Sequence, residues 1–378
     1  MVIPFNKPYM TGKELVYIEQ AYNIGQLAGD GPFTKQCHQW LEECIGSKKA
    51  LLTHSCTAAL EMTAILLDIQ PGDEVIMPSY TFVSTANAFV LRGGIPVFVD
   101  IRKDTLNIDE ALIEDAITSR TKAIVPVHYA GVSCEMDFIM DIAKRHNLFV
   151  VEDAAQGVLS SYKGRMLGSI GHLGCLSFHE TKNIISGEGG ALLINDERFI
   201  DRAEIIRDKG TDRSQFFLGK VDKYTWKDVG SSFLPGEIIA AFLFAQLEKS
   251  RDITNKRLLI WNRYNKAFRM LEKVRLPIIP KDCEHNAHMY YLLLNNAEDR
   301  DKFIKGMRVK GVDCIFHYVP LHLSSAGVKY GRFFKDLSTT ERYAKHLVRL
   351  PLWIGMSDRE QTKVIDAVIS AVYNTPTN

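Results

Sequence analysis

The sequence predicts an α/β fold with a large domain, built on a mostly parallel sheet, and a smaller α+β domain at the C-terminal side. Short apolar runs alternate with helical patterns over residues 72–155, which is typical of parallel strands buried on both faces. The 378 residues are long enough for two domains. The rhythm then changes to a few strands among helices, so we expect domains over residues 1–250 and 251–378.

The first 70 residues predict an opening segment, two helices, a strand and a third helix. Helical spacing of apolar side chains begins near residue 11 and recurs over 33–45. A strand over 50–53 leads directly into the third helix, which opens with His54-Ser-Cys-Thr57. Free backbone N–H groups and the helix dipole at such a start can bind a phosphate. An ordinary N-cap without a ligand is the alternative.

The central strands predict a crevice, because ligands of doubly wound sheets bind at the carboxyl ends of the strands. Asp153 ends one strand, and its carboxylate is costly to bury unless it is paired. It could face a protonated ring nitrogen, a sugar hydroxyl or a metal, or cap a helix. Phe82 follows another strand and could stack on a planar ligand or belong to the core. We expect strands over 74–78, 96–100, 122–127, 148–153, 174–177 and 191–195, and helices over 81–91, 109–117 and 135–146.

Lys182 follows an apolar run, Gly174 to Ser177, and precedes the glycine-rich turn Ser186-Gly-Glu-Gly-Gly190. A lysine held between packed strands loses its proton more easily, because burial disfavours the charged form. Such an amine can form a Schiff base with a carbonyl. The alternative is a surface lysine beside a turn.

The remaining chain predicts an aromatic-rich stretch over residues 203–232, which could be an interface arm, a lid or a solvated loop. One long helix is expected from Glu237 to Met270. His317 and Tyr318 lie where a predicted strand ends, with partly buried core histidines as the alternative. Further strands are expected near 289–294 and 312–319, and helices near 300–310, 339–350 and 358–373.

Composition excludes several classes of protein. The net charge of +1 gives no basic field for nucleic acid or for an anionic membrane. No apolar run approaches the ~20 residues of a membrane span, and the N-terminus lacks the pattern of a signal peptide. The seven cysteines are widely spaced and form no CxxC, which favours free thiols in a cytoplasmic protein and no metal site. No GxGxxG follows a strand.

Four blocks together resemble the signature of the sugar aminotransferases, which depend on pyridoxal 5'-phosphate (PLP) and have the aspartate-aminotransferase fold, fold type I. The resemblance extends in order from about residue 3 to 373. It implies a cytoplasmic enzyme that passes through the pyridoxamine form of the cofactor. The blocks are Pro78-Ser-Tyr-Thr-Phe82, Asp153-Ala-Ala-Gln156, Ser177-Phe-His-Glu-Thr-Lys182 and Gly187-Glu-Gly-Gly190.

The resemblance implies a role for each matching residue. Lys182 would be the catalytic lysine that holds the cofactor, and Asp153 would pair with the ring nitrogen. The other cofactor-binding positions would be Phe82 on the ring, Gln156 near its phenolic oxygen, and Cys56, Thr57 and Ser177 at the phosphate.

The family's Gly-x-Asn-x-Arg run, whose asparagine reaches the phosphate from the second subunit, corresponds here to Gly230-Ser-Ser-Phe-Leu234. Ser232 therefore replaces the asparagine and Leu234 the arginine.

The same resemblance implies substrates and a partner. L-glutamate would donate the amino group, and a dTDP-linked sugar, dTDP-4-keto-6-deoxyglucose, would accept it in surface-polysaccharide biosynthesis. Tyr224, His317 and Tyr318 are the expected substrate-binding residues. A homodimer with composite active sites is expected, with residues 213–226 as the arm that crosses over. Lys182 argues against the dehydratase branch, which has histidine there. Other keto sugars, cysteine desulfurases and a non-catalytic relative of the fold are the alternatives.

Overall fold

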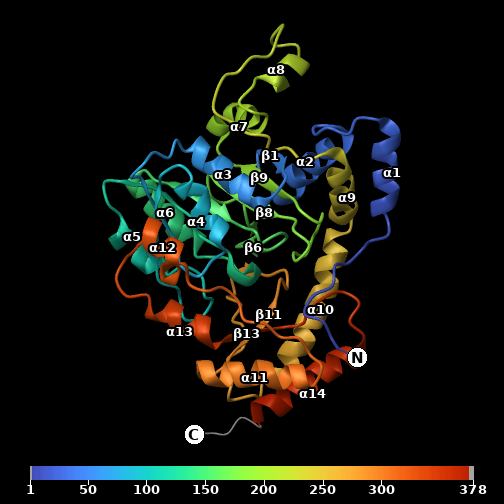
Figure 1. Ribbon diagram of the computed structural model, residues 1–378, viewed down its shortest axis with the longest axis vertical. Coiled ribbons are helices and arrows are strands. Elements are labelled where there is room, and N and C mark those ends of the chain that lie inside the picture. The colour runs from blue at the N-terminus through green and yellow to red at the C-terminus, as the bar shows by residue number, and fades with distance from the viewer. Residues whose placement is uncertain (1, 374–378) are drawn as a thin grey trace.

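The computed structural model describes residues 2–373, which form a large sheet of eight strands with helices on both faces (Figure 1). In space the strand order is β1-β9-β8-β5-β4-β2-β3-β12. Only β9 runs against the others, because it pairs antiparallel with both β1 and β8. The predicted α/β fold with a mostly parallel sheet is confirmed. The strands are β1 (Lys49–Thr53), β2 (Glu74–Pro78), β3 (Ile95–Val99), β4 (Thr121–Ile124), β5 (Phe149–Asp153), β8 (Leu173–Ser177), β9 (Gly190–Ile194) and β12 (Arg332–Phe333).

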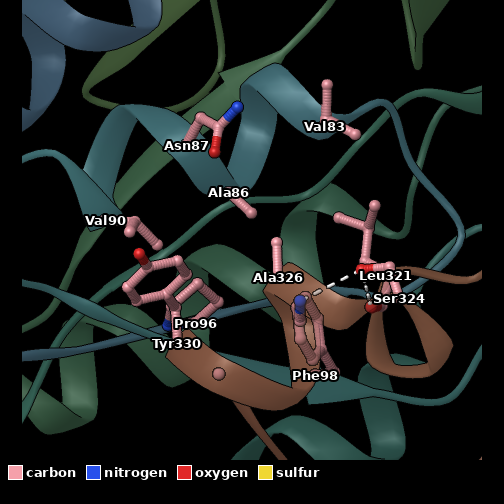
Figure 2. A pocket seen from close by; sticks show the side chains of 12 residues that line it. Val83, Ala86, Asn87, Val90, Pro96, Phe98, Leu321, Ser324, Ala326 and Tyr330 are labelled. Atoms are coloured by element: carbon pink, nitrogen blue, oxygen red, sulfur yellow. Dashed lines mark hydrogen bonds between the residues drawn. The ribbon is translucent and has the colours of Figure 1, made fainter.

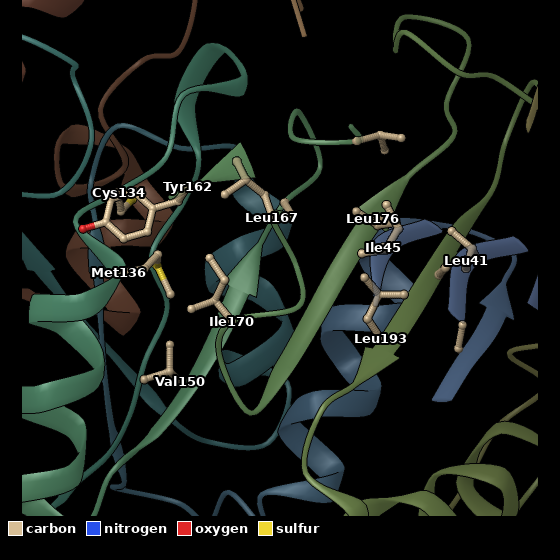
Figure 3. Packing of buried hydrophobic residues seen from close by; sticks show 14 of the residues in the cluster. Leu41, Ile45, Cys134, Met136, Val150, Tyr162, Leu167, Ile170, Leu176 and Leu193 are labelled. Atoms are coloured by element: carbon tan, nitrogen blue, oxygen red, sulfur yellow. The ribbon is translucent and has the colours of Figure 1, made fainter. Parts of the chain in front are cut away.

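Each face of this sheet carries its own apolar core. Along β2, Ile76 belongs to one cluster while Val75 and Met77 belong to the other, since successive side chains of a strand point to opposite faces. Figure 3 shows the first cluster, with Leu41 of α2 lying near Leu193 of β9. Helices α1 (Glu14–Ile24), α2 (Pro32–Ile45), α5 (Ile113–Ala116), α6 (Met136–His146) and α9 (Glu237–Glu248) contribute to that cluster, and α3 (Cys56–Leu66), α4 (Val83–Val90) and α7 (Ile200–Arg207) to the opposite one.

The C-terminal part builds a separate core around the two-stranded sheet β11–β13. Ile3, from the other end of the chain, is 1% exposed in this core, and its N–H donates to the Gly311 carbonyl at 2.9 Å. β12 joins the large sheet instead, so the C-terminal part touches both cores; the division at residue 250 remains a prediction. The elements are α10 (Ser250–Phe268), β10 (Cys283–Glu284), β11 (Tyr290–Leu293), α11 (Ala297–Val309), α12 (Ser325–Tyr330), α13 (Ser338–His346), β13 (Leu347–Leu350) and α14 (Asp358–Tyr373).

Three expectations about the elements are wrong. The long helix over 237–270 is two helices, α9 and α10, which meet at Lys249. α9 packs in the large core, whereas α10 leaves that core after Ile253 and packs in the C-terminal core from Ile260 on. The expected strand at 312–319 makes only isolated bridges, at Val312 and Ile315. The expected helix over 339–350 ends at His346, and its last four residues form β13, because they pair with β11.

Residues 208–232 form an arm that projects beyond α7 in Figure 1, with the short helix α8 (Arg213–Phe217) near its tip. Two backbone bridges, Asp208 to Ser232 and Thr211 to Trp226, close its base. Asp212 is buried and accepts a hydrogen bond from the Thr225 N–H at 2.6 Å. The base of the arm is therefore tied together, whereas its tip is exposed; its role as an interface arm, a lid or a solvated loop remains a prediction. The remaining short strands, β6 (Ser161–Tyr162) and β7 (Arg165–Met166), pair with each other, and β6 pairs with β10.

Candidate active site

The carboxyl ends of β5 and β8 bring Asp153 and Ser177 to the same edge of the large sheet, because these two strands are parallel neighbours. Lys182 lies in the turn that follows β8, and its backbone N–H donates to the His179 carbonyl at 2.8 Å. The N-terminus of α3 meets the same edge beside the start of β9. The sheet edge at which the strand pattern predicts a ligand is therefore bordered by β5, β8, β9 and α3.

Asp153 is a buried carboxylate that no cation neutralises. It is 4% exposed and accepts hydrogen bonds from the Thr85 hydroxyl at 2.7 Å and from the Ala155 N–H at 3.1 Å. Within residues 2–373 no lysine, arginine or histidine lies within ion-pair distance of it. A buried ion is normally paired. Asp153 therefore has the properties of a group that receives a positively charged part of a ligand.

Its neighbour Glu152 points to the opposite side of β5 and has a structural role. It is fully buried and accepts from His128 at 2.9 Å and from three backbone N–H groups between residues 168 and 171, at 2.6–2.9 Å. This satisfied carboxylate contrasts with Asp153. The strand alternation thus separates a carboxylate without a cation, Asp153, from one that its own chain satisfies, Glu152.

Lys182 is half-buried, and burial lowers its pKa. The Cys56 thiol and the Asp153 carboxylate act in the opposite direction, whereas Arg349 lowers the pKa further. These effects place all three groups within electrostatic reach of the Lys182 amine. A lysine with a lowered pKa is a better nucleophile toward a carbonyl than an exposed one, because more of it is neutral.

The start of α3 offers free hydrogen-bond donors. The Ser55 hydroxyl caps the helix by accepting from the Ala58 N–H at 3.1 Å, so Ser55 itself is the ordinary N-cap. The N–H groups of Cys56 and Thr57 find no acceptor in the described part of the chain, as expected for a first helical turn. A β-carbon at Gly190 would lie 2.4 Å from the Cys56 nitrogen, so only glycine lets β9 approach this close.

Side chains around this helix start match an anion site. The Thr57 hydroxyl lies 2.7 Å from that of Ser84, the second residue of α4. Ser177 is buried, with its hydroxyl 3.5 Å from the His179 N–H. Burial raises the pKa of the Cys56 thiol well above its usual value, so this cysteine is neutral. The helix start therefore presents hydroxyl and N–H donors without an ionised thiol.

Aromatic side chains line the side of the site that faces the C-terminal core. The His317 and Tyr318 rings stack at 3.7 Å, and the Tyr129 hydroxyl bonds His317 at 2.8 Å. Burial lowers the pKa of His317, so it is neutral. The Gln156 amide donates to the Tyr318 hydroxyl at 2.8 Å, which links the strand-end block to this cluster. Phe82 is 55% exposed, with its ring 6.3 Å from that of Tyr318.

Two predicted residues are not joined to this group within the chain. Tyr224 stands on the arm, is 51% exposed, and makes its ring contact with Phe216 at 5.9 Å. Ser232 is exposed at the base of the arm, next to Phe233, whose carbonyl accepts from the His54 N–H at 2.9 Å. Ser232 thus lies beside the segment that leads into α3, whereas Tyr224 has no contact with Lys182, Asp153 or Gln156 in the described residues.

Sequence reasoning missed Thr85, Ser84 and Arg349. The two hydroxyls lie in the first turn of α4, and Thr85 also bonds Thr81, four residues earlier, at 2.8 Å. The two threonines, four residues apart after a strand, were the sequence signal that could have indicated these hydroxyls. Arg349 lies in β13, where the local pattern resembled a helix end, so no signal marked it.

Three other observations add no residue to this site. No group of three metal-binding side chains occurs among residues 2–373, and no helix there is long and apolar enough to span a membrane. Figure 2 shows a small apolar pocket between α4 and α12, lined by Val83, Ala86, Phe98 and Tyr330 among others. It contains neither Lys182 nor Asp153.

Sugar aminotransferases are among the solved structures similar to this chain. The PLP-form of the putative sugar aminotransferase Spr1654 from Streptococcus pneumoniae superposes with a TM-score of 0.92 at 27% identity, with both chains covered completely at 100%. The fold and the site therefore define a PLP-dependent enzyme of aminotransferase type.

The sequence profile of the DegT/DnrJ/EryC1/StrS aminotransferase family matches residues 8–369, so the chain belongs to that family. It is 35% identical to the spore coat polysaccharide biosynthesis protein SpsC of Bacillus subtilis, over 97% of this chain and 96% of SpsC. It is also 32% identical to GDP-perosamine synthase of Caulobacter vibrioides, over 96% of each chain.

The residues of this chain fit the cofactor of the family. Asp153 is a buried carboxylate without a cation, as a protonated ring nitrogen requires. Lys182 is an amine with a lowered pKa at the same sheet edge, and the α3 start has the free donors that a phosphate requires. Within residues 2–373, Asp153 has no ion-pair partner, and the Cys56 and Thr57 N–H groups have no acceptor, so these groups are available to a ligand.

Proposed function

We propose that this enzyme transfers the amino group of L-glutamate to dTDP-4-keto-6-deoxyglucose and forms dTDP-4-amino-4,6-dideoxygalactose for a surface polysaccharide. The observation that carries the aminotransferase part is the juxtaposition of Asp153, buried without a cation, and Lys182, an amine whose pKa is lowered by burial. The choice of sugar is supported by the resemblance over 29–34, 125–131 and 224–226. SpsC, by its name, also acts in polysaccharide biosynthesis.

Bound PLP supplies an electron sink for the carbanion that forms when the donor loses its Cα proton. In this proposal Asp153 holds the proton of the ring nitrogen, and the Thr85 hydroxyl fixes the orientation of its carboxylate. Cys56, Thr57 and Ser177 bind the phosphate, and Phe82 covers the ring. Gln156 is oriented by its bonds to the Ala130 N–H and to the Tyr318 hydroxyl, at 2.6 and 2.8 Å.

Lys182 has two tasks in the proposal. Its neutral amine would hold the cofactor, and as a free amine it would move the proton at the donor's Cα. Burial serves both tasks, because it keeps a larger fraction of the amine neutral near pH 7. The neutral His317 and the Tyr318 hydroxyl lie 135 and 136 residues from Lys182 in sequence. In this proposal they would bind sugar hydroxyls.

The proposal includes a homodimer with composite active sites. The arm over 208–232 exposes Phe217, Leu218 and Trp226 at 69%, 67% and 79%. Apolar side chains gathered on an ordered projection suit an interface with a second copy. Tyr224 and Ser232 would then act in the partner's site. All seven cysteines are free thiols, which suits the reducing cytoplasm.

A second candidate is an acceptor with another nucleotide. GDP-perosamine synthase, 32% identical to this chain, is by its name linked to a GDP sugar. A GDP-4-keto-6-deoxy sugar would present a keto carbon at the same ring position and differ in the base and in the ribose 2'-hydroxyl. Other keto positions and the gluco epimer of the product are variants of the same reaction.

The visible absorption spectrum tests the proposal in three steps. The purified protein loaded with PLP should show an absorption band in the visible spectrum. L-Glutamate should bleach this band. Addition of dTDP-4-keto-6-deoxyglucose should restore it, and the GDP-linked keto sugar should restore it more slowly. No band after loading would overturn the role of Lys182. Bleaching without recovery would retain the aminotransferase and reject the sugar.

A further inference from the structure

Arg349 lies on the face of the β11–β13 sheet that looks toward the candidate active site. It is directly opposite Tyr291 in the antiparallel pair, and opposed residues project to the same face. The Tyr291 ring packs on Tyr129 at 6.0 Å, and Tyr129 in turn bonds His317 at 2.8 Å. Arg349 therefore extends toward the aromatic cluster that borders Lys182.

The guanidinium of Arg349 is hydrogen-bonded along one edge, through its Nε and Nη2 atoms. Its Nε and Nη2 atoms donate to the Phe316 carbonyl at 3.3 and 3.1 Å, and it stacks over the Phe5 ring at 4.9 Å. Within residues 2–373 no carboxylate forms an ion pair with it, whereas Arg332, on the preceding strand of the chain, pairs with Glu74 at 2.8 Å. Its Nη1 atom has no protein acceptor there.

The charges around Arg349 leave this cation uncompensated. Burial lowers its pKa, and its neighbours are the hydroxyls of Tyr129, Tyr318 and Tyr80, all of them neutral. Arg349 also lowers the pKa of Lys182, which shows that its charge reaches the catalytic amine. A partly buried cation without a counter-ion is costly, and a bound anion would offset that cost.

We propose that Arg349 binds a carboxylate of the amino-acid donor beside Lys182. This inference rests on the proposed function and names the group that recognises its first substrate. The α-carboxylate is bonded to the very carbon from which Lys182 removes a proton, so it must lie close to that amine. The diphosphate of a nucleotide sugar, in contrast, lies across the sugar ring from the keto carbon. A planar guanidinium also matches a carboxylate with two parallel hydrogen bonds.

This chain lacks one arginine of the family's sequence pattern, so we ask whether Arg349 supplies a cation from another element. The arginine of the Gly-x-Asn-x-Arg run is Leu234 here, and Leu234 packs beside Gly29. Arg349 reaches the site from a different element, β13. Its neighbours on both sides of the strand, Val348 and Leu350, are buried in the C-terminal core and fix its direction.

The test uses the PLP-loaded enzyme and follows the glutamate-dependent bleaching of the visible band in a stopped-flow instrument. Arg349→Gln should reduce kcat/KM of this half-reaction about 10- to 100-fold, the range of a charge-assisted pair. Arg349→Lys should recover part of the loss. Arg359→Gln, the same change at an exposed position of α14, is the matched control and should leave it unchanged.

A binding measurement supplies a second readout. Glutarate, which carries two carboxylates and no amine, should bind the loaded wild-type enzyme in calorimetry and bind Arg349→Gln at least about 10-fold more weakly. L-Glutamine identifies the carboxylate: an equal loss for glutamine and glutamate assigns the α-carboxylate, and a loss for glutamate alone assigns the side chain. The melting temperature and the visible band of each variant verify that it is folded and loaded.

Unchanged glutamate kinetics and glutarate affinity in Arg349→Gln would overturn the inference, as would a rise confined to the KM of the nucleotide sugar, which would assign Arg349 to the diphosphate. These results are distinct from a failure of the proposed function. In that case the wild-type enzyme itself would fail to bleach with glutamate, or would fail to regain its band with the keto sugar.

Discussion

The strand-end site and the arm differ in how their side chains are held. Asp153, Gln156 and Ser177 are 4%, 4% and 5% exposed, and each has hydrogen-bond partners from its own chain. Tyr224 and Trp226 on the arm are 51% and 79% exposed, although the arm itself is ordered. One chain therefore assembles the groups that we propose to act on the cofactor, whereas the proposed role of the arm requires a second copy that covers it.

This difference in burial suggests that the reaction chemistry and the assembly of the enzyme depend on different regions. Reaction chemistry tolerates little displacement of the acting groups, so they are placed on strands packed from both faces. We propose that specificity and assembly depend on exposed side chains of the arm, because exposed loops can change without disturbing the sheet. Substitutions at the two regions should accordingly affect different measurements.

The largest effect is expected from Lys182→Ala. Without the amine there is neither a covalent link to the cofactor nor a group to move the Cα proton, so kcat/KM should fall by at least about 10⁴-fold. The fold should remain, because Lys182 is only half-buried in a turn. Steady-state kinetics together with circular dichroism measure both. A variant with near-normal turnover would contradict the proposed role of Lys182 in catalysis.

Asp153→Asn should separate activity from stability. The amide cannot hold the proton on the ring nitrogen, so kcat/KM should fall about 100-fold or more. The cofactor-free protein should become more stable by about 1 kcal/mol, because the variant no longer buries a carboxylate without a cation. Urea denaturation of the cofactor-free protein measures this gain. A loss of stability would mean that Asp153 is satisfied by its own chain, like Glu152.

Thr85→Val tests the support of Asp153 from α4. Removal of the hydroxyl that donates at 2.7 Å should lower kcat/KM about 10-fold and weaken PLP binding, since the carboxylate loses its fixed orientation. Thr85→Ser keeps the donor and is the matched control. Equal kinetics in the valine and serine variants would show that the Ala155 N–H alone orients Asp153.

The smallest effect on a single chain is expected on the arm. Trp226→Ala should leave the unfolding free energy of the monomer within about 0.5 kcal/mol, as for other exposed positions. It should raise the dissociation constant of the dimer at least about 10-fold, as loss of a large aromatic contact does. Sedimentation velocity over a dilution series measures this, with Val309→Ala, exposed on α11, as the control. An unchanged dissociation constant would exclude the arm from the interface.

Local patterns were enough to locate the groups that lie at strand ends. Asp153 and Lys182 follow apolar runs, and the hydroxyl-rich start of α3 follows β1 directly, so short-range order along the chain implied their shared edge. The single long helix over 237–270 failed because periodicity reports which face is apolar, not which core receives that face.

What the sequence by itself determined is the alternation of buried strands and helices, and with it the edge of the sheet where Asp153 and Lys182 meet. Only the tertiary structure decided that Thr85 holds Asp153 from 68 residues away, and that Arg349 faces the site from β13. Such contacts depend on the register of strands and on how two cores pack together. Those quantities are set by long-range burial and not by any residue's neighbours in the chain.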